Sequence, residues 1–215
     1  MSMSSALLDT LGERDQSNRI YGVVVALVTN TNDPAKIGRV KLQYPWLGKD
    51  AEGYWARVAS PMTGKEMGFY FMPDVDSEVL VAFEQGDVRF PYVIGSLWNG
   101  KDKPPLANDN GKNDIRLIKS RSGHTIRLDD ENDKEKIEII DKTGKNRISI
   151  DTAENSITIT SAKDVTISAP NGAIKLDAQN IQIKSSAETK IQSGAGMDVK
   201  ASGVMNVKGA TVNIN

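Results

Sequence analysis

Few side chains in this chain could carry out chemistry. His124 is the one histidine and cysteine is absent, which excludes disulfides, thiolate metal sites and thiol nucleophiles. A single imidazole could hold a metal ion only if several chains brought their copies of it together. His124 follows Ser122 and Gly123 and precedes an alternating segment, a context that favours a hydrogen-bonded turn residue over a ligand. We therefore expect no metal and no cofactor.

An acidic run at residues 129–135 is the second candidate, since two of its carboxylates could be paired as in a glycosidase. Lysines interrupt the run, and no pocket-forming segment accompanies it, so a charged turn is the better interpretation. The sequence also lacks a serine nucleophile elbow, a phosphate loop and metal-ligand spacing. The chain is expected not to be an enzyme, and an envelope-degrading hydrolase is the least favoured alternative.

The second half is organised by a recurring apolar pair at positions i and i+2, which places both side chains on one face of a strand. Ile126, Ile137 and Ile148 begin pairs 11 residues apart, whereas later pairs begin 7 to 9 residues apart. The pairs are Ile115/Leu117, Ile126/Leu128, Ile137/Ile139, Ile148/Ile150, Ile157/Ile159, Val165/Ile167, Ile174/Leu176 and Ile181/Ile183, with weaker copies at Thr189/Ile191, Met197/Val199, Met205/Val207 and Val212/Ile214. Such repetition predicts a rod of stacked β units.

One chain of such units would expose an apolar face and its strand edges. Three chains wound around a three-fold axis would bury the pairs and cover each edge with a neighbouring chain, so we predict an intertwined homotrimer; a single-chain β-solenoid is the competing geometry. The predicted trimer core is Ile126, Leu128, Ile137, Ile139, Ile148, Ile150, Ile157, Ile159, Val165, Ile167, Ile174, Leu176, Ile181 and Ile183. The shorter period in the later units suggests a wider base and a narrower shaft.

The first half predicts a small barrel. Short strands are expected at 21–28, 38–44, 54–59, 69–72, 78–83 and 91–97, which suits a five-stranded OB-type barrel. The expected organisation is an N-terminal segment at 1–19, the barrel at 20–100, a linker at 101–113 and the shaft at 114–215. Barrel aromatics raise the alternative of stacking single-stranded nucleic acid: Tyr44, Trp46, Tyr54, Trp55, Phe69, Tyr70 and Phe71.

Charge and hydropathy narrow the function classes. The net charge is −1, and no basic field is available to bind phosphates, so no nucleic-acid partner is expected. The longest apolar run, residues 23–28, is too short to cross a bilayer. Residues 1–16 lack the pattern of a secretory signal, so synthesis in the cytoplasm without a signal peptide is expected.

Ordered motifs of the first half resemble the phage baseplate assembly protein V and VgrG spike family. The motifs that carry the resemblance are Asn32-Asp33-Pro34, Gly38-Arg39-Val40-Lys41, Tyr44-Pro45-Trp46-Leu47-Gly48, Trp55-Ala56-Arg57-Val58-Ala59-Ser60-Pro61, Gly68-Phe69-Tyr70-Phe71-Met72-Pro73 and Pro91-Tyr92-Val93-Ile94-Gly95-Ser96-Leu97-Trp98. The unit at residues 121–130 is similar as well. The resemblance implies an all-β fold: an N-terminal OB-fold barrel followed by a triple-stranded β-helix formed by a homotrimer.

It also implies a structural central spike of a contractile tail or injection machine, located in a virion or phage-tail-like baseplate. A ring-forming hub protein would bind the OB end and residues 1–19. A PAAR-type tip protein would bind the C-terminal end at Val212, Ile214 and Asn215, and the target membrane would be met only transiently. The alternative function is a trimeric fibre or adhesin that binds a surface glycan.

Overall fold

The structure, a computed structural model, describes residues 19–48 and 52–214. The chain divides into two compact units, the first ending at Thr160 and the second beginning at Ser161. All strands of the described residues lie in the first unit, and helix is confined there to the 3-10 turns η2 (Pro45–Leu47) and η3 (Glu84–Gly86). The all-β prediction is confirmed.

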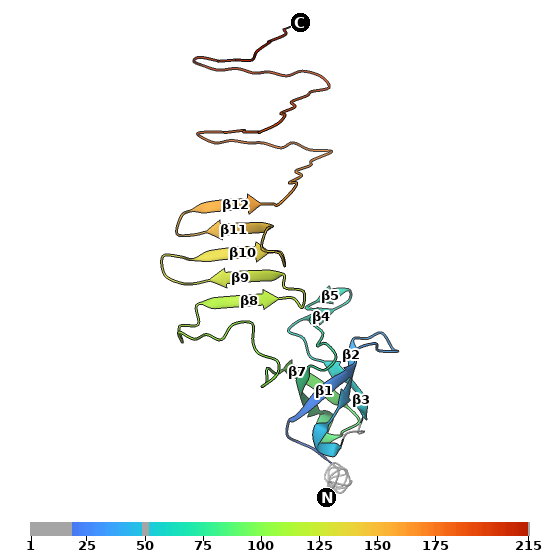
Figure 1. Ribbon diagram of the computed structural model, residues 1–215. Helices are drawn as coiled ribbons and strands as arrows, with labels where there is room; N and C mark the ends of the chain where they lie inside the picture. The colour runs from blue at the N-terminus through green and yellow to red at the C-terminus, as the bar shows by residue number, and fades with distance from the viewer. Residues whose placement is uncertain (1–18, 49–51, 215) are drawn as a thin grey trace, which may run out of the picture. The chain divides into compact units, whose positions relative to one another are not determined.

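Five strands close into a barrel in the order β1-β2-β3-β7-β6 (Figure 1). The pairing is antiparallel except between β3 and β7, which run parallel. The bounds are β1 (Val24–Asn30), β2 (Arg39–Gln43), β3 (Glu52–Val58), β6 (Glu78–Phe83) and β7 (Pro91–Ser96). The predicted five-stranded closed barrel is present.

Alternating residues of these strands fill the barrel, as period-2 patterning requires. Val40, Leu42 and Tyr44, at alternating positions of the predicted strand 38–44, are all buried. Burial raises the pKa of the Tyr44 phenol to about 12. The core consists of Ala26, Val28, Val40, Leu42, Tyr44, Ala56, Val79, Val81, Phe83 and Val93.

Asp33 organises the loop between β1 and β2. Its carboxylate, 7% exposed, accepts backbone N–H bonds from Ala35 and Ile37 at 3.0 Å and from Arg39 at 3.3 Å. The Arg39 guanidinium donates to the same carboxylate at 2.8 Å. This guanidinium, with the backbone donors, holds the pKa of Asp33 well below its usual range despite burial. The loop between β1 and β2 is therefore held by several hydrogen bonds to one carboxylate.

Two strand predictions are wrong in detail. Residues 21–23 precede β1 rather than belonging to it, and residues 69–72 form no strand. The pairing in that region is instead a short hairpin of β4 (Thr63–Gly64) and β5 (Met67–Gly68). Aromatic β propensity at 69–72 was the misleading signal, because those residues find no neighbouring strand to pair with.

Beyond the linker, five strands form one antiparallel sheet in the order β12-β11-β10-β9-β8 (Figure 1). Each hairpin turn contains one residue with positive φ, namely Gly123, Asp133, Gly144 and Asn155. The bounds are β8 (Ile115–Lys119), β9 (Thr125–Asp129), β10 (Lys136–Ile140), β11 (Arg147–Asp151) and β12 (Ser156–Thr160). These strands therefore pair within one chain, which corrects the prediction that neighbouring chains cover every strand edge.

The second unit contains no strand within its described residues, 161–214. Over residues 163–214 the backbone forms one backbone–backbone hydrogen bond, from Gly172 N–H to the Ala169 carbonyl at 3.2 Å. Beyond Asn155, none of the described residues has a positive φ, so the turn type that closes the hairpins of the sheet is not repeated. The chain runs there in extended passes (Figure 1). The triple-stranded β-helix remains a prediction.

Candidate assembly interface

Two continuous rows of side chains cover one face of the β8–β12 sheet, which we call the apolar face. Directly opposed residues of antiparallel strands project to the same side, so the register assigns each row. Row one is Ile118, Ile126, Ile139, Ile148 and Ile159. Row two is Arg116, Leu128, Ile137, Ile150 and Ile157. Eight of the predicted core residues, those from Ile126 to Ile159, therefore lie side by side on one surface.

All nine apolar side chains of the two rows are exposed in the single chain, with Ile157 reaching 71%. Cross-strand neighbours cover part of each side chain, but no sheet formed by the described residues of the first unit lies over the face as a second layer. A β-sheet with one apolar face requires a partner layer to bury that face. The single chain therefore leaves the apolar face largely exposed.

The opposite face of the sheet is charged and internally paired. Glu138, 8% exposed, lies within 3.7 Å of both Arg127 and Arg147. Lys136 Nζ lies 2.9 Å from Asp151 Oδ2, and hydrogen bonding to this lysine lowers the pKa of the Asp151 carboxyl. This face is complete within one chain and suits contact with water.

The first apolar pair does not join the apolar face. Ile115 is opposed by Asp129 and Leu117 by Arg127, so both project to the charged face. There they line a cavity of about 560 Å³ together with Trp98 and Leu106 of the preceding segment. The position on the apolar face that the i, i+2 spacing predicted for this pair is occupied by Ile118. In β8 the i, i+2 pair therefore projects to the charged face, beside the linker, and not to the apolar face.

The second unit continues the apolar positions without continuing the sheet. All six predicted core residues of this unit are exposed: Val165, Ile167, Ile174, Leu176, Ile181 and Ile183. Two predicted tip-contact residues, Val212 and Ile214, are exposed as well, whereas Asn215 lies outside the described residues. Residues 163–214 combine an exposed apolar stripe with extended backbone that forms a single backbone–backbone hydrogen bond.

The candidate catalytic groups lie in turns or at the end of a strand. His124 lies between β8 and β9, where its Nδ1 accepts the backbone N–H of Lys142 at 3.3 Å. In the acidic run, Asp129 Oδ2 lies 2.5 Å from Arg127 and Glu131 Oε1 lies 2.8 Å from Lys134. No cluster of three potential metal ligands occurs within residues 19–48 and 52–214. His124 and the carboxylates of the acidic run thus take part in turn hydrogen bonds and ion pairs.

The barrel carries four cations on its outer surface beside aromatic rings. Arg39 and Lys41 lie over Trp55, at 5.8 and 5.7 Å from the ring centroid, and Arg57 lies 4.4 Å from that of Tyr92. The fourth, Arg89, lies 5.7 Å from the ring of Phe90. Their carboxylate partners are Asp33, Glu52, Glu84 and Asp87, respectively, with the pairs at 2.6 to 3.4 Å. A phosphate backbone would have to displace these carboxylates, so the geometry does not favour nucleic-acid binding.

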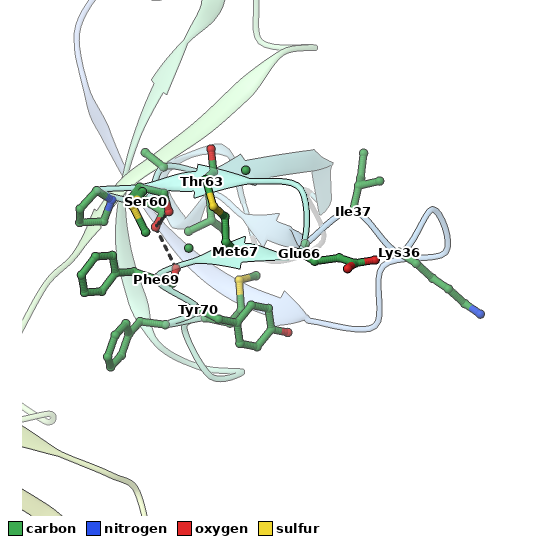
Figure 2. A pocket seen from close by; sticks show the side chains of 17 residues that line it. Lys36, Ile37, Ser60, Thr63, Glu66, Met67, Phe69 and Tyr70 are labelled. Carbon is green, nitrogen blue, oxygen red and sulfur yellow. Dashed lines mark hydrogen bonds between the residues drawn. The ribbon is translucent and has the colours of Figure 1, made fainter.

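Sequence reasoning missed one exposed element, the hairpin β4–β5 with the residues that follow it. We call residues 60–72 the aromatic arm; Figure 2 shows it around an open pocket of about 690 Å³. Phe69, Tyr70 and Phe71 are all exposed there, whereas Tyr44 packs in the core. The available signal was the pair Gly64 and Gly68, whose spacing permits a tight hairpin.

Comparison with known protein families identifies the barrel. The model of the type VI secretion system/phage-baseplate injector OB domain matches residues 24–98. That stretch begins at the first residue of β1 and ends two residues after β7. Residues 24–98 are therefore an OB domain of the kind found in type VI secretion and phage-baseplate injectors.

Several VgrG proteins are similar to part of this chain. The spike protein VgrG5 of Pseudomonas aeruginosa is 39% identical over 95 residues, which is 40% of this chain and 12% of VgrG5. VgrG2a of the same organism is 33% identical over 105 residues, or 43% of this chain and 12% of VgrG2a. The actin cross-linking toxin VgrG1 of Vibrio cholerae is 33% identical over 72 residues, or 32% of this chain and 7% of the toxin.

The matched stretch thus spans about an eighth or less of the length of these relatives. Two of them are spike proteins of type VI secretion systems by name. No helix within the described residues has the length and apolar character that a membrane span requires. The family-model match lies in the barrel, at residues 24–98.

Proposed function

We propose that this VgrG-like chain is a structural central-spike subunit that acts as a homotrimer. The observation that carries the proposal is the apolar face, with its two rows of exposed side chains on a regular sheet. Burying nine half-exposed aliphatic side chains would contribute on the order of 10 kcal/mol per chain. A contribution of this size would favour the assembled sheet over the isolated chain.

Three copies suit this surface better than two. Two sheets packed face to face would leave the rows open along both sides, whereas three sheets close a prism with both rows inside. The charged face of every sheet would then contact solvent, as its ion pairs require. In residues 163–214, the backbone groups would find their partners on the other two chains.

The trimer would work mechanically. The barrel end would bind a ring-forming hub, the C-terminal end would seat a PAAR-type tip protein, and sheath contraction would drive the shaft through the target envelope. No catalytic step is needed, because the force comes from the sheath. The particle containing it would be a phage tail or a related injection machine.

Light scattering of the purified chain tests the assembly. The expected mass is three times 23.4 kDa. A chain truncated after Lys112 should keep a folded barrel and lose the stable trimer, because β8–β12 are removed. A monomeric full-length chain would eliminate the proposal, and co-purification of the full chain with a ring-forming hub would extend it to the machine.

A further inference from the structure

The aromatic arm is a built element of the barrel rather than a loose loop. Thr63 pairs with Gly68 and Gly64 pairs with Met67 in the hairpin. The N–H of Phe69 donates to the Met62 carbonyl at 3.1 Å, and Ser60 Oγ donates to the Phe69 carbonyl at 2.8 Å (Figure 2). These two bonds hold the backbone of Phe69, the first residue after the hairpin, in place.

Glycine at position 68 is required by the conformation of the arm. Gly68 has φ +143°, and a Cβ atom there would lie 2.5 Å from the Met62 carbonyl oxygen. A side chain would therefore break the bond pattern that positions Phe69. The local sequence thus specifies the hairpin itself.

The arm nevertheless leaves its apolar side chains uncovered. Met67, Tyr70 and Phe71 are 63%, 82% and 66% exposed. A ribbon with strands of two residues buries too little surface to be stable by itself. A partner surface would supply the missing burial.

The exposed rings lie on two sides of the arm. Phe69 and Phe71 stack with their ring centroids 6.4 Å apart and their planes 25° apart. Figure 2 shows the Tyr70 ring on the other side of the arm from Phe69. Because successive side chains of an extended chain alternate, the two phenylalanines form one apolar surface and Tyr70 forms another.

The phenylalanine side is continuous with row one of the apolar face. Phe71 lines a cavity of about 720 Å³, and the aliphatic residues that line it with Phe71 include Ile118, Ile126, Ile139, Ile148 and Ile159. These five residues are the whole of row one. A partner protein surface that covers row one would therefore also contact Phe71.

We propose that Phe69 and Phe71 of each chain pack against the apolar face of a second copy. This inference rests on the proposed trimer, in which a neighbouring sheet is the occupant of that cavity. The arm would then join each barrel to the shaft of its neighbour, so that an axial load on the barrel reaches two chains. An aromatic pair suits this contact because it offers a large apolar area and no charge.

Engineered cysteines test the contact directly, since the native chain has none. One tagged chain carries Phe71→Cys, and a second, differently tagged chain carries Ile126→Cys. The two chains are co-expressed, purified through both tags and treated with a short bismaleimide. Each chain has a single thiol, so a product containing both tags must join two copies.

A two-tag product from trimers supports the inference. Trimers of the correct mass that give no two-tag product overturn it and leave the proposed function standing. If the native chain, which has no cysteine, is itself a monomer, both the inference and the proposed function are overturned. The matched control pairs Tyr70→Cys with Ile126→Cys, which should give at most one tenth of the product because Tyr70 lies on the other side of the arm.

Paired substitutions give a second measurement if the cysteine chains assemble poorly. Phe71→Ser should lower the melting temperature of the trimer by at least about 4 °C, because a buried ring is lost. Tyr70→Ser removes a ring of similar size from the other side and should leave the melting temperature within about 1 °C. Equal effects of the two substitutions contradict the inference.

Discussion

Ile118 lies directly opposite Ile126 across strands β8 and β9, and this pairing turns Ile115 and Leu117 to the charged face. One strand thus contributes to two surfaces. Its apolar pair faces the linker, and its third aliphatic residue begins a row of the apolar face. The base of the sheet is thereby packed against its own chain on one side and left open to a partner on the other.

Assembly through the apolar face predicts different outcomes for neighbouring residues of β12. Ile157→Lys should abolish trimer formation at micromolar concentration, because it would bury a charge without a partner. Thr158→Lys places the same charge on the opposite face and should leave the trimer intact. Light scattering measures both, and a trimeric Ile157→Lys chain would contradict the interface.

The second unit should gain protection only on assembly. In the trimer, amides of residues 163–214 should exchange slowly with deuterium, because neighbouring chains would bond them. In the monomeric Ile157→Lys chain they should exchange almost at the unprotected rate, since the single chain forms one backbone–backbone bond over this range. The amides of β1 serve as the internal control and should stay protected in both. Fast exchange in an intact trimer would rule out intertwined chains.

Ionisation of Asp33 should make the stability of the barrel fall at low pH. Its pKa is depressed in the folded state, so its contribution is complete above the unfolded value of about 3.9 and is lost as the pH falls through the folded value. Asp33→Asn should lower the melting temperature at pH 6, and the gap from the native chain should shrink below about pH 4.

The exposed linker substitution Asp109→Asn is the control for that series. At pH 6 its melting temperature should equal that of the native chain, because the Asp109 side chain carries none of the loop bonds that Asp33 accepts. A constant gap between Asp33→Asn and the native chain from pH 6 to pH 2 would show that ionisation of Asp33 does not stabilise the loop.

Gly53 should tolerate no side chain. A Cβ atom at this position would lie 2.5 Å from Cε2 of the buried Tyr44 ring and 3.3 Å from the Leu42 carbonyl oxygen. Gly53→Ala should therefore cost about 1–3 kcal/mol of unfolding free energy, as overpacking of a core does. Gly95→Ala in β7 meets nothing within 4 Å and should change that free energy by less than about 0.5 kcal/mol. Denaturant unfolding compares the two.

The sequence by itself determined the all-β class, the closed barrel and the apolar pairs from Ile126 to Ile159. Period-2 spacing dictates which side chains of a strand share a face, so the spacing alone was enough to assign Ile126 and Leu128 to the same face. The ordered motifs of the barrel were equally informative, because turn residues at fixed positions constrain where strands begin and end. The change of period after Ile148 also fell near a real boundary, since the sheet ends at Thr160.

Only the tertiary structure decided which strands pair and which surfaces remain open. Spacing defines the faces of a strand, but not which of them meets a neighbour, so the reversed phase of β8 became visible only through its register with β9. The same holds for the aromatic arm: β propensity marked residues 69–72 as a strand, and the absence of a pairing edge left Phe69 and Phe71 exposed. Pairing depends on contacts between distant segments, which no local pattern encodes.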